Sequence, residues 1–229
     1  MSGGPIAARG LVKRFGRREA LGGVDLEVPR GALWGVVGAD GAGKTTLLRC
    51  IAGLYRPDAG DVAPGVAGQR LIGFAPQGFH LYGDLTVEEN LVFFGGLYGI
   101  ERHALDERID ELLAFAELAG HRSRMAGELS GGMQQKLVLA CALVHTPPIL
   151  LLDEPTTGVD PVSRREFWRL VEHLHSGGAT ILLASAYLDE IERCEHVVFL
   201  HAGRVIASGE PDELRGRHRS LEAAFLEAM

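Results

Sequence analysis

The sequence predicts an α/β fold in which a mainly parallel sheet is covered by helices. Two continuous apolar runs, at 149–152 and 180–184, are typical of strands that are buried on both faces. Segments of helical periodicity alternate with such strands along the chain, as expected of a parallel sheet. The stretch from about 77 to 124 is rich in helical patterns and carries no strand pattern. We therefore expect a helical lobe inserted into the α/β core.

The first part of the core is expected to hold three strands and one helix. Residues 21–29 alternate between apolar and polar side chains, which predicts a half-buried strand. The apolar run 33–37 predicts a second strand, and a helix is expected directly after it, over 45–54. Residues 70–76 predict a further strand before the lobe begins.

The expected lobe contains two helices, and a third follows it. Thr86 and Glu89 form a capping box, the pattern that begins a helix. The second helix is expected over 104–119, because these apolar residues recur at helical spacing: Leu105, Ile109, Leu112, Leu113 and Ala116. Ser130 is expected to begin another helix that reaches about Val144.

The remaining segments complete one domain of 229 residues. Two short strand patterns, 197–200 and 204–207, flank a turn at 202–203 and predict a hairpin. The expected division of the domain 1–229 is a core of 1–76 and 125–210, a lobe of about 77–124 and a helical tail of 211–229.

Composition and charge narrow the classes of function. The chain is 46% hydrophobic and 23% charged, as is usual for a globular domain. Its formal net charge of -7 disfavours a nucleic-acid partner, since such proteins usually carry a basic face. Cys50, Cys141 and Cys194 lack metal-ligand spacing, so we expect reduced thiols in a cytoplasmic protein. No apolar run approaches the roughly 18 residues that span a bilayer, so work at a membrane would require another chain.

A phosphate-binding loop lies at 38–45, between a predicted strand and a predicted helix. Its glycines let backbone N–H groups turn toward phosphates, and the helix N-terminus adds a favourable partial charge. Lys44 is expected to bind the β- and γ-phosphates, and Thr45 is expected to bind Mg²⁺. The candidate nucleotide-binding residues here are Gly38, Ala39, Asp40, Gly41, Ala42, Gly43, Lys44, Thr45 and Thr46.

Two acids follow the apolar run 149–152. Open α/β sheets bind ligands at the carboxyl ends of their strands. Asp153 is therefore expected to hold Mg²⁺ through water, and Glu154 to orient or deprotonate the attacking water. Acids also follow many buried strands that have no catalytic role, and the phosphate loop in the same chain favours the catalytic interpretation.

The residues Ser130, Gly131 and Gly132 begin a predicted helix. A serine N-cap followed by glycines leaves N–H groups free for an anion, although an ordinary capped helix shows the same pattern. The order and spacing of this motif, the phosphate loop and the acidic strand end resemble the nucleotide-binding subunits of ABC transporters. The resemblance covers nearly the whole chain, with Met133 where glutamine is commonest.

This resemblance implies a P-loop NTPase core with a mainly parallel sheet, an N-terminal antiparallel β portion and an inserted α-helical subdomain. It also implies a head-to-tail homodimer or heterodimer. Each ATP, with Mg²⁺, would lie between the phosphate loop of one chain and Ser130, Gly131 and Gly132 of the other. Membrane-spanning permease subunits are the implied partners, at the inner face of the cell membrane.

Three more positions match the family, and one departs from it. Gln77 resembles the glutamine that contacts magnesium and water and links to the membrane subunit. Phe15 stands where an aromatic ring stacks on adenine, with core packing as the alternative. The segment 158–161 resembles the loop that crosses the dimer interface. Ala186 stands where most members carry a histidine that senses the γ-phosphate.

The missing histidine leaves several hypotheses open. Loss of one transition-state hydrogen bond can slow a reaction by about 10²–10³, so hydrolysis is expected to be slow. A partner chain could retain the histidine, or Ser185 or a water could replace it.

The main hypothesis is an ATPase subunit that powers a transporter by dimer closure. Segments 81–91 and 220–225 resemble the corresponding segments of stand-alone ATPase subunits from drug- or lipid-exporting systems. The alternatives are a low-turnover regulatory subunit and, less favoured, a soluble ABC ATPase acting on ribosomes or DNA.

Overall fold

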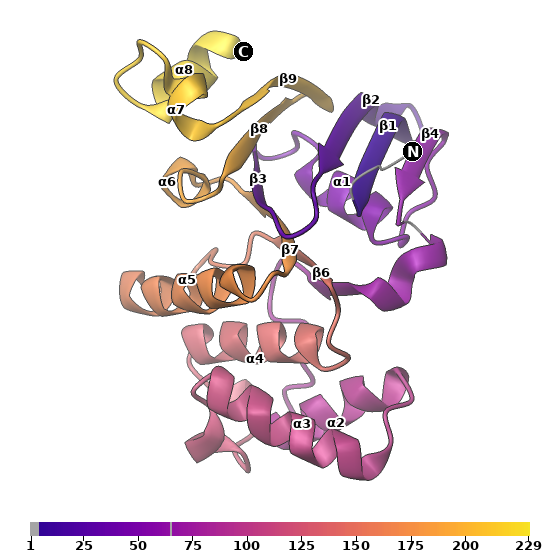
Figure 1. The fold of residues 1–229 in the computed structure, drawn as a ribbon, viewed down its shortest axis with the longest axis vertical. Coiled ribbons are helices and arrows are strands. Elements are labelled where there is room, and N and C mark those ends of the chain that lie inside the picture. The colour runs from indigo at the N-terminus through magenta and orange to yellow at the C-terminus, as the bar shows by residue number, and fades with distance from the viewer. Residues whose placement is uncertain (1–4, 65) are drawn as a thin grey trace.

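The larger of two sheets forms the centre of the computed structural model, which describes residues 5–64 and 66–229 (Figure 1). Its strand order is β5-β6-β7-β3-β8-β9. The first five strands run parallel and the last is antiparallel. Their bounds are β5 Ile72–Ala75, β6 Ile149–Asp153, β7 Thr180–Ser185, β3 Leu33–Val37, β8 His196–His201 and β9 Arg204–Gly209. The predicted parallel sheet and the predicted hairpin are both confirmed.

A smaller antiparallel sheet forms the N-terminal β portion. Its order is β2-β1-β4, from β2 (Arg18–Val28), β1 (Ile6–Phe15) and β4 (Ala59–Ala63). Only β2 was predicted as a strand from the local pattern. The register of β1 shifts between Ala8 and Leu11, which interrupts its apolar alternation, and β4 is almost entirely exposed. Neither strand therefore carries the usual pattern of a half-buried strand.

The described part of the chain contains eight α-helices. They are α1 Lys44–Ile51, α2 Val87–Leu97, α3 Arg102–Phe115, α4 Gly131–Leu143, α5 Pro161–Ser176, α6 Leu188–Ile191, α7 Pro211–Arg215 and α8 Leu221–Ala228. Short 3₁₀ helices occupy η1 Val66–Leu71, η2 Ala119–His121 and η3 Ala126–Glu128. All of them are too short or too polar to pass through a bilayer.

Two apolar clusters lie on opposite faces of the larger sheet. Ile149 and Leu151 of β6 belong to the cluster shared with α1 and the smaller sheet. Leu150 and Leu152 belong to the cluster shared with the lobe helices, α4 and α5. Alternate residues of one strand thus enter different cores, which confirms burial on both faces.

Several element bounds differ from the expectation. Helix α1 ends at Ile51 rather than at 54, because the chain turns at Gly53, whose φ is 70°. Strand β5 is confined to Ile72–Ala75, since the residues before it form η1. Helix α3 ends at Phe115 rather than at 119, and Glu117 beyond it has a φ of 59°.

Helix α5 was missed, although Asp160 caps it and Pro161 occupies its first turn. Its buried face is formed by Phe167, Trp168, Leu170 and Val171. A layered arrangement follows, in which α4 lies between α5 and the pair α2–α3 (Figure 1). Because α4 contacts the lobe helices and α5 alike, the domain boundary at about 124 stays a prediction. The three cysteines are buried and free.

Candidate functional site

The phosphate loop joins β3 to α1 and requires glycine at several positions. Gly41 and Gly43 have φ values of 79° and 111°, in the left-handed region that favours glycine. A Cβ on Gly38 would lie 2.3 Å from the carbonyl oxygen of Leu200. Backbone contacts also hold the loop closed, since Gly203 donates a hydrogen bond of 2.8 Å to the carbonyl of Ala42.

A cavity of about 140 Å³ opens at this loop. It is lined by Ala20, Asp40, Gly41, Gly43, Lys44, Thr45, Thr46, Gln77 and Glu154. The structure thus brings together most of the loop candidates with Gln77 and Glu154. Gly38, Ala39 and Ala42 shape the loop but do not line the cavity.

Lys44 is buried within its own loop, with only 4% of its side chain exposed. Its Nζ donates to the carbonyl of Gly38 at 2.7 Å and lies 3.3 Å from that of Ala39. The same Nζ forms an ion pair of 3.0 Å with Oε1 of Glu154. A phosphate that enters the cavity therefore competes with Glu154 for this ammonium.

Asp153 ends β6 beside the first turn of α1. Its Oδ1 accepts a hydrogen bond of 3.1 Å from the hydroxyl of Thr45. Its Oδ2 is buried and has no hydrogen-bond partner among the described residues. Burial raises the pKa of Asp153, and the hydrogen bond from Thr45 opposes that shift. An unpartnered carboxylate oxygen beside a hydroxyl suits Mg²⁺, which prefers hard oxygen ligands.

Glu154 is held in an uncommon backbone conformation, with a φ of 49°. Its amide donates a hydrogen bond of 2.8 Å to the carbonyl of Ala184 at the end of β7. Its Oε2 accepts a hydrogen bond of 3.1 Å from the hydroxyl of Thr157. The carboxylate is therefore fixed between Lys44 and Thr157, directly at the phosphate cavity.

The serine–glycine motif begins α4 away from this cavity. Ser130 is exposed, and its Oγ accepts a hydrogen bond of 3.4 Å from the amide of Met133, which confirms the N-cap. A Cβ on Gly132 would lie 2.4 Å from Oγ of Ser163, so α5 approaches α4 closely here. Ser130, Gly131 and Gly132 do not line the phosphate cavity of their own chain.

Phe15 is 46% exposed, which contradicts the alternative that it packs in the core. Its ring contacts Tyr55 edge-on at a centroid distance of 5.4 Å, and Nζ of Lys13 lies 5.5 Å from its centroid. A supported aromatic ring is thus open to a ligand, while adenine stacking itself stays a prediction.

Arg18 is a residue of this site that the sequence did not identify. It pairs with Phe15 across β1 and β2. A Cβ placed on Gly41 would lie 3.1 Å from its Nη2. This guanidinium therefore lies beside the phosphate loop, while the backbone of Arg18 pairs with that of Phe15. Arg17 in the turn and Arg18 at the start of β2 form no recognisable sequence motif. The position of Arg18 depends on how β2 pairs with β1, which the sequence alone does not reveal.

The hydroxyl of Ser185, at the end of β7, already has two hydrogen-bond partners within the protein. Its hydroxyl donates to Oε2 of Glu190 at 2.9 Å and accepts from the amide of Tyr187 at 3.0 Å. Ala186 beside it is exposed. Ser185 is buried and does not line the phosphate cavity, while its replacement of the histidine stays a prediction.

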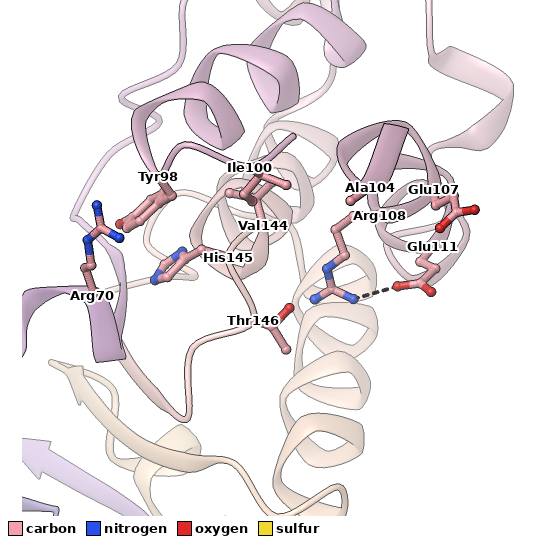
Figure 2. Close-up of a pocket in the computed structure, with 10 residues that line it drawn as sticks. All are labelled: Arg70, Tyr98, Ile100, Ala104, Glu107, Arg108, Glu111, Val144, His145 and Thr146. Atoms are coloured by element: carbon pink, nitrogen blue, oxygen red, sulfur yellow. Dashed lines mark hydrogen bonds and ion pairs between the residues drawn. The ribbon is translucent and has the colours of Figure 1, made fainter. Parts of the chain in front are cut away.

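A second pocket, of about 450 Å³, lies between the end of α2, helix α3 and the end of α4 (Figure 2). The rings of Tyr98 and His145 stack there at 3.6 Å, and Nε2 of His145 lies 3.0 Å from the carbonyl oxygen of Ile72. Burial lowers the pKa of His145. Arg70 lies beside these two rings, whereas Arg108 lies across the pocket on α3, where it pairs with Glu111 at 2.8 Å.

Comparison with known proteins agrees with this geometry. The sequence pattern of the ABC transporter family matches residues 21–157. The chain is 43% identical over 224 residues to the probable multidrug ABC transporter ATP-binding protein YbhF of Escherichia coli strain K12. That match covers 93% of this chain but only 39% of the relative.

Two relatives of more similar length have names that refer to export or resistance. The Nod factor export ATP-binding protein I of Burkholderia lata is 40% identical, with 92% of this chain and 72% of the relative covered. The daunorubicin resistance ATP-binding protein DrrA3 of Streptomyces coeruleorubidus is 42% identical, with 92% and 69% covered.

Solved structures share the same fold. An ATP-binding subunit of an ABC transporter superposes with a TM-score of 0.86 at 30% identity, covering 97% of this chain and 98% of that one. The dimeric structure of a bacterial ABC transporter cassette gives 0.82 at 26% identity, covering 90% and 98%.

Proposed function

Because the chain belongs to the ABC transporter family, we propose that it binds ATP at the phosphate loop and hydrolyses it to power an exporter. One observation supports this proposal most strongly: Lys44, Thr45 and Glu154 line the same cavity. Asp153 lies next to it and accepts a hydrogen bond from Thr45. Lys44 supplies the only lysine cation within that lining, and the loop amides add donors for the phosphates.

Asp153, Thr45 and Gln77 are the proposed ligands of Mg²⁺, and Thr45 and Gln77 line the same cavity. The unpartnered Oδ2 of Asp153 supports this assignment, and Gln77 is exposed where it lines the site. Bound Mg²⁺ would neutralise charge on the β- and γ-phosphates. Phe15 is proposed to stack on the adenine and Arg18 to approach the intervening phosphate or ribose.

Hydrolysis requires that Glu154 be released from Lys44. The phosphates draw the ammonium away, and the carboxylate of Glu154 is then free to orient and deprotonate a water. Thr157 keeps the same carboxylate in place during this exchange, since it binds the other oxygen. ATP binding and the release of the Glu154 carboxylate are therefore coupled through Lys44.

Dimerisation is proposed because the ATP contacts expected from the serine–glycine motif lie outside the cavity. Ser130, Gly131 and Gly132 are presented at the N-terminus of α4, where free N–H groups can bind an anion. A related cassette has been solved as a dimer. In the proposed head-to-tail dimer, homomeric or heteromeric, these residues cover the nucleotide of the partner subunit, and ATP closes the pair.

The proposed permease surface lies on the lobe and the neighbouring sheet edge. Large apolar side chains are exposed there, among them Leu54, Leu71, Phe79, Tyr82, Phe93 and Leu97. Exposed apolar residues gathered on one face mark a protein contact. The pocket of Figure 2 continues this surface past Tyr98, which also lines the grooves beside Leu54 and Phe94. Docking to a permease would place the chain at the inner face of the cell membrane.

A second function, that of a low-turnover regulatory subunit, is favoured by one observation. Ala186 offers no hydrogen bond, and the hydroxyl of Ser185 is already bound to Glu190. This site would then rely on a water for its γ-phosphate contact, or the chain would form one half of an asymmetric pair whose partner keeps the histidine. The ATPase activity of the purified chain distinguishes the two functions.

The direct test of the nucleotide site is Lys44→Ala. Removal of the ammonium should abolish measurable ATP binding, while Lys136→Ala, a lysine of α4 that pairs with Glu117 at 2.7 Å, should leave it nearly unchanged. Isothermal calorimetry with Mg-ATP measures both. Unchanged affinity in Lys44→Ala would contradict the assignment of the phosphate loop.

A further inference from the structure

We propose that Glu190 is a positioning residue, which fixes the loop of the catalytic acid Glu154 to the segment that carries Ala186. The inference rests on the proposed function only in naming Glu154 as the acid. Glu190 belongs to α6, four residues after Ala186, and 2% of the residue is exposed. It lies outside every motif that the sequence analysis singled out.

Both carboxylate oxygens of Glu190 are bound by groups from different segments. Oε1 accepts a hydrogen bond from the hydroxyl of Thr156. Oε2 accepts one of 2.9 Å from the hydroxyl of Ser185, the last residue of β7. Charge-assisted hydrogen bonds are stronger than neutral ones. This carboxylate therefore connects the loop after β6 firmly to the end of β7.

The backbone of Glu154 is consequently held on both sides by the end of β7. On its N-terminal side, its own amide binds the carbonyl of Ala184 at 2.8 Å. Two residues later, Thr156 is tied through Glu190 to Ser185. A non-glycine residue at a φ of 49° persists only where surrounding contacts impose it. Glu190 supplies the contact on the C-terminal side.

Arg164 extends this connection toward the serine–glycine motif. Its Nε forms an ion pair of 3.3 Å with Oε1 of Glu190, and its guanidinium lies 4.7 Å from the ring centroid of Tyr187. The preceding residue, Ser163, is the one that packs against Gly132 at the start of α4. One buried carboxylate thus links the chain's own catalytic acid to the helix that it offers to the partner subunit.

The charge of Glu190 is what makes the contact specific. A buried carboxylate is unfavourable unless it is paired and hydrogen-bonded, and here Arg164, Thr156 and Ser185 supply those partners. If the segment at Ala186 moves, Ser185 and Glu190 move with it, and so does the loop after Glu154. The connection from Ser185 through Glu190 to Thr156 is thus present although the histidine is absent.

The test compares Thr156→Val with Thr156→Ser. Valine preserves the shape but removes the hydroxyl, so kcat for ATP should fall about 10-fold to 100-fold, the range expected of a misplaced catalytic group. The KM for ATP should stay within about two-fold, because the phosphate loop is intact. Serine restores the donor and should restore most of kcat.

Glu190→Gln should reproduce the loss seen in Thr156→Val. Glu192→Gln, an exposed acid two residues away, is the matched control and should behave as wild type. Equal rates in Thr156→Val and Thr156→Ser, or a wild-type kcat in Glu190→Gln, would overturn the proposal.

Hydrogen exchange gives a readout that does not depend on turnover. In Glu190→Gln and Thr156→Val, amides of residues 154–159 should exchange about ten-fold faster, while those of residues 38–47 should not change. This result would support the proposal even if the wild-type chain hydrolysed no ATP, an outcome that would contradict the proposed function alone. Unchanged exchange at 154–159 would overturn the positioning role.

Discussion

The ammonium of Lys44 lies 3.0 Å from Oε1 of Glu154, and less than a tenth of each side chain is exposed. The proposed phosphate ligand and the proposed catalytic acid therefore neutralise each other before any nucleotide binds. In the proposed mechanism, the carboxylate of Glu154 is not free to activate a water until a phosphate takes its place beside Lys44.

Glu154→Gln should slow hydrolysis by at least about 10²-fold, since an amide cannot take a proton from water. ATP affinity should rise, because Lys44 no longer has an anionic competitor. Size-exclusion chromatography with Mg-ATP should then show an accumulating dimer. Glu192→Gln serves as the control here too, and normal turnover in Glu154→Gln would mean that another group activates the water.

Arg18→Gln should weaken ATP binding about ten-fold, close to 1.4 kcal/mol. The guanidinium beside Gly41 is exposed, so its attraction to phosphate should also decline as salt concentration rises. Titration of Mg-ATP at low and high salt measures both effects. Arg17→Gln, from the same turn, is the control. Equal losses in the two variants would indicate only a general charge effect.

Sequence reasoning located the parts of this site that lie within one segment. The glycines, Lys44 and Thr45 follow one another along the chain, and the acids follow an unmistakable buried strand. Arg18 and Glu190 could not be predicted from the sequence. The position of Arg18 depends on a strand register, and that of Glu190 depends on contacts between segments that are distant along the chain.

The same distinction explains the fold. Strands buried on both faces, such as β6 and β7, carry continuous apolar runs that are visible in the sequence. Strand β4 is stabilised by pairing with β1 and buries little of its own surface, so its residues show no pattern. Helix α5 begins at Pro161 with Asp160 as its N-cap, but these two residues were assigned only to the loop that resembles the dimer-interface loop of the family.

Leu97→Asp should prevent co-purification with permease subunits in detergent while leaving ATP binding unchanged. Leu97 is 64% exposed at the end of α2, so the substitution places no charge in the core. Leu226→Asp is the matched control, since Leu226 on α8 is 59% exposed and lies outside the proposed surface. Loss of the permease in both variants, or in neither, would contradict the location of that surface.

Ala186→His should raise kcat by about ten-fold or more, because it restores one hydrogen bond to the γ-phosphate. The position is exposed, so the imidazole requires no repacking. Ala186→Leu adds similar bulk without a donor and should leave kcat unchanged. A steady-state assay on the purified chain is sufficient. If histidine has no effect, a water or another residue already makes this contact.

The central claim is that a second subunit completes the ATP site through the N-terminus of α4. A crystal structure of the Glu154→Gln protein with Mg-ATP would reveal this arrangement. We expect a dimer in which Oγ of the partner subunit's Ser130 lies about 3 Å from a γ-phosphate oxygen. A nucleotide-loaded assembly in which Ser130 is remote from every phosphate would contradict it.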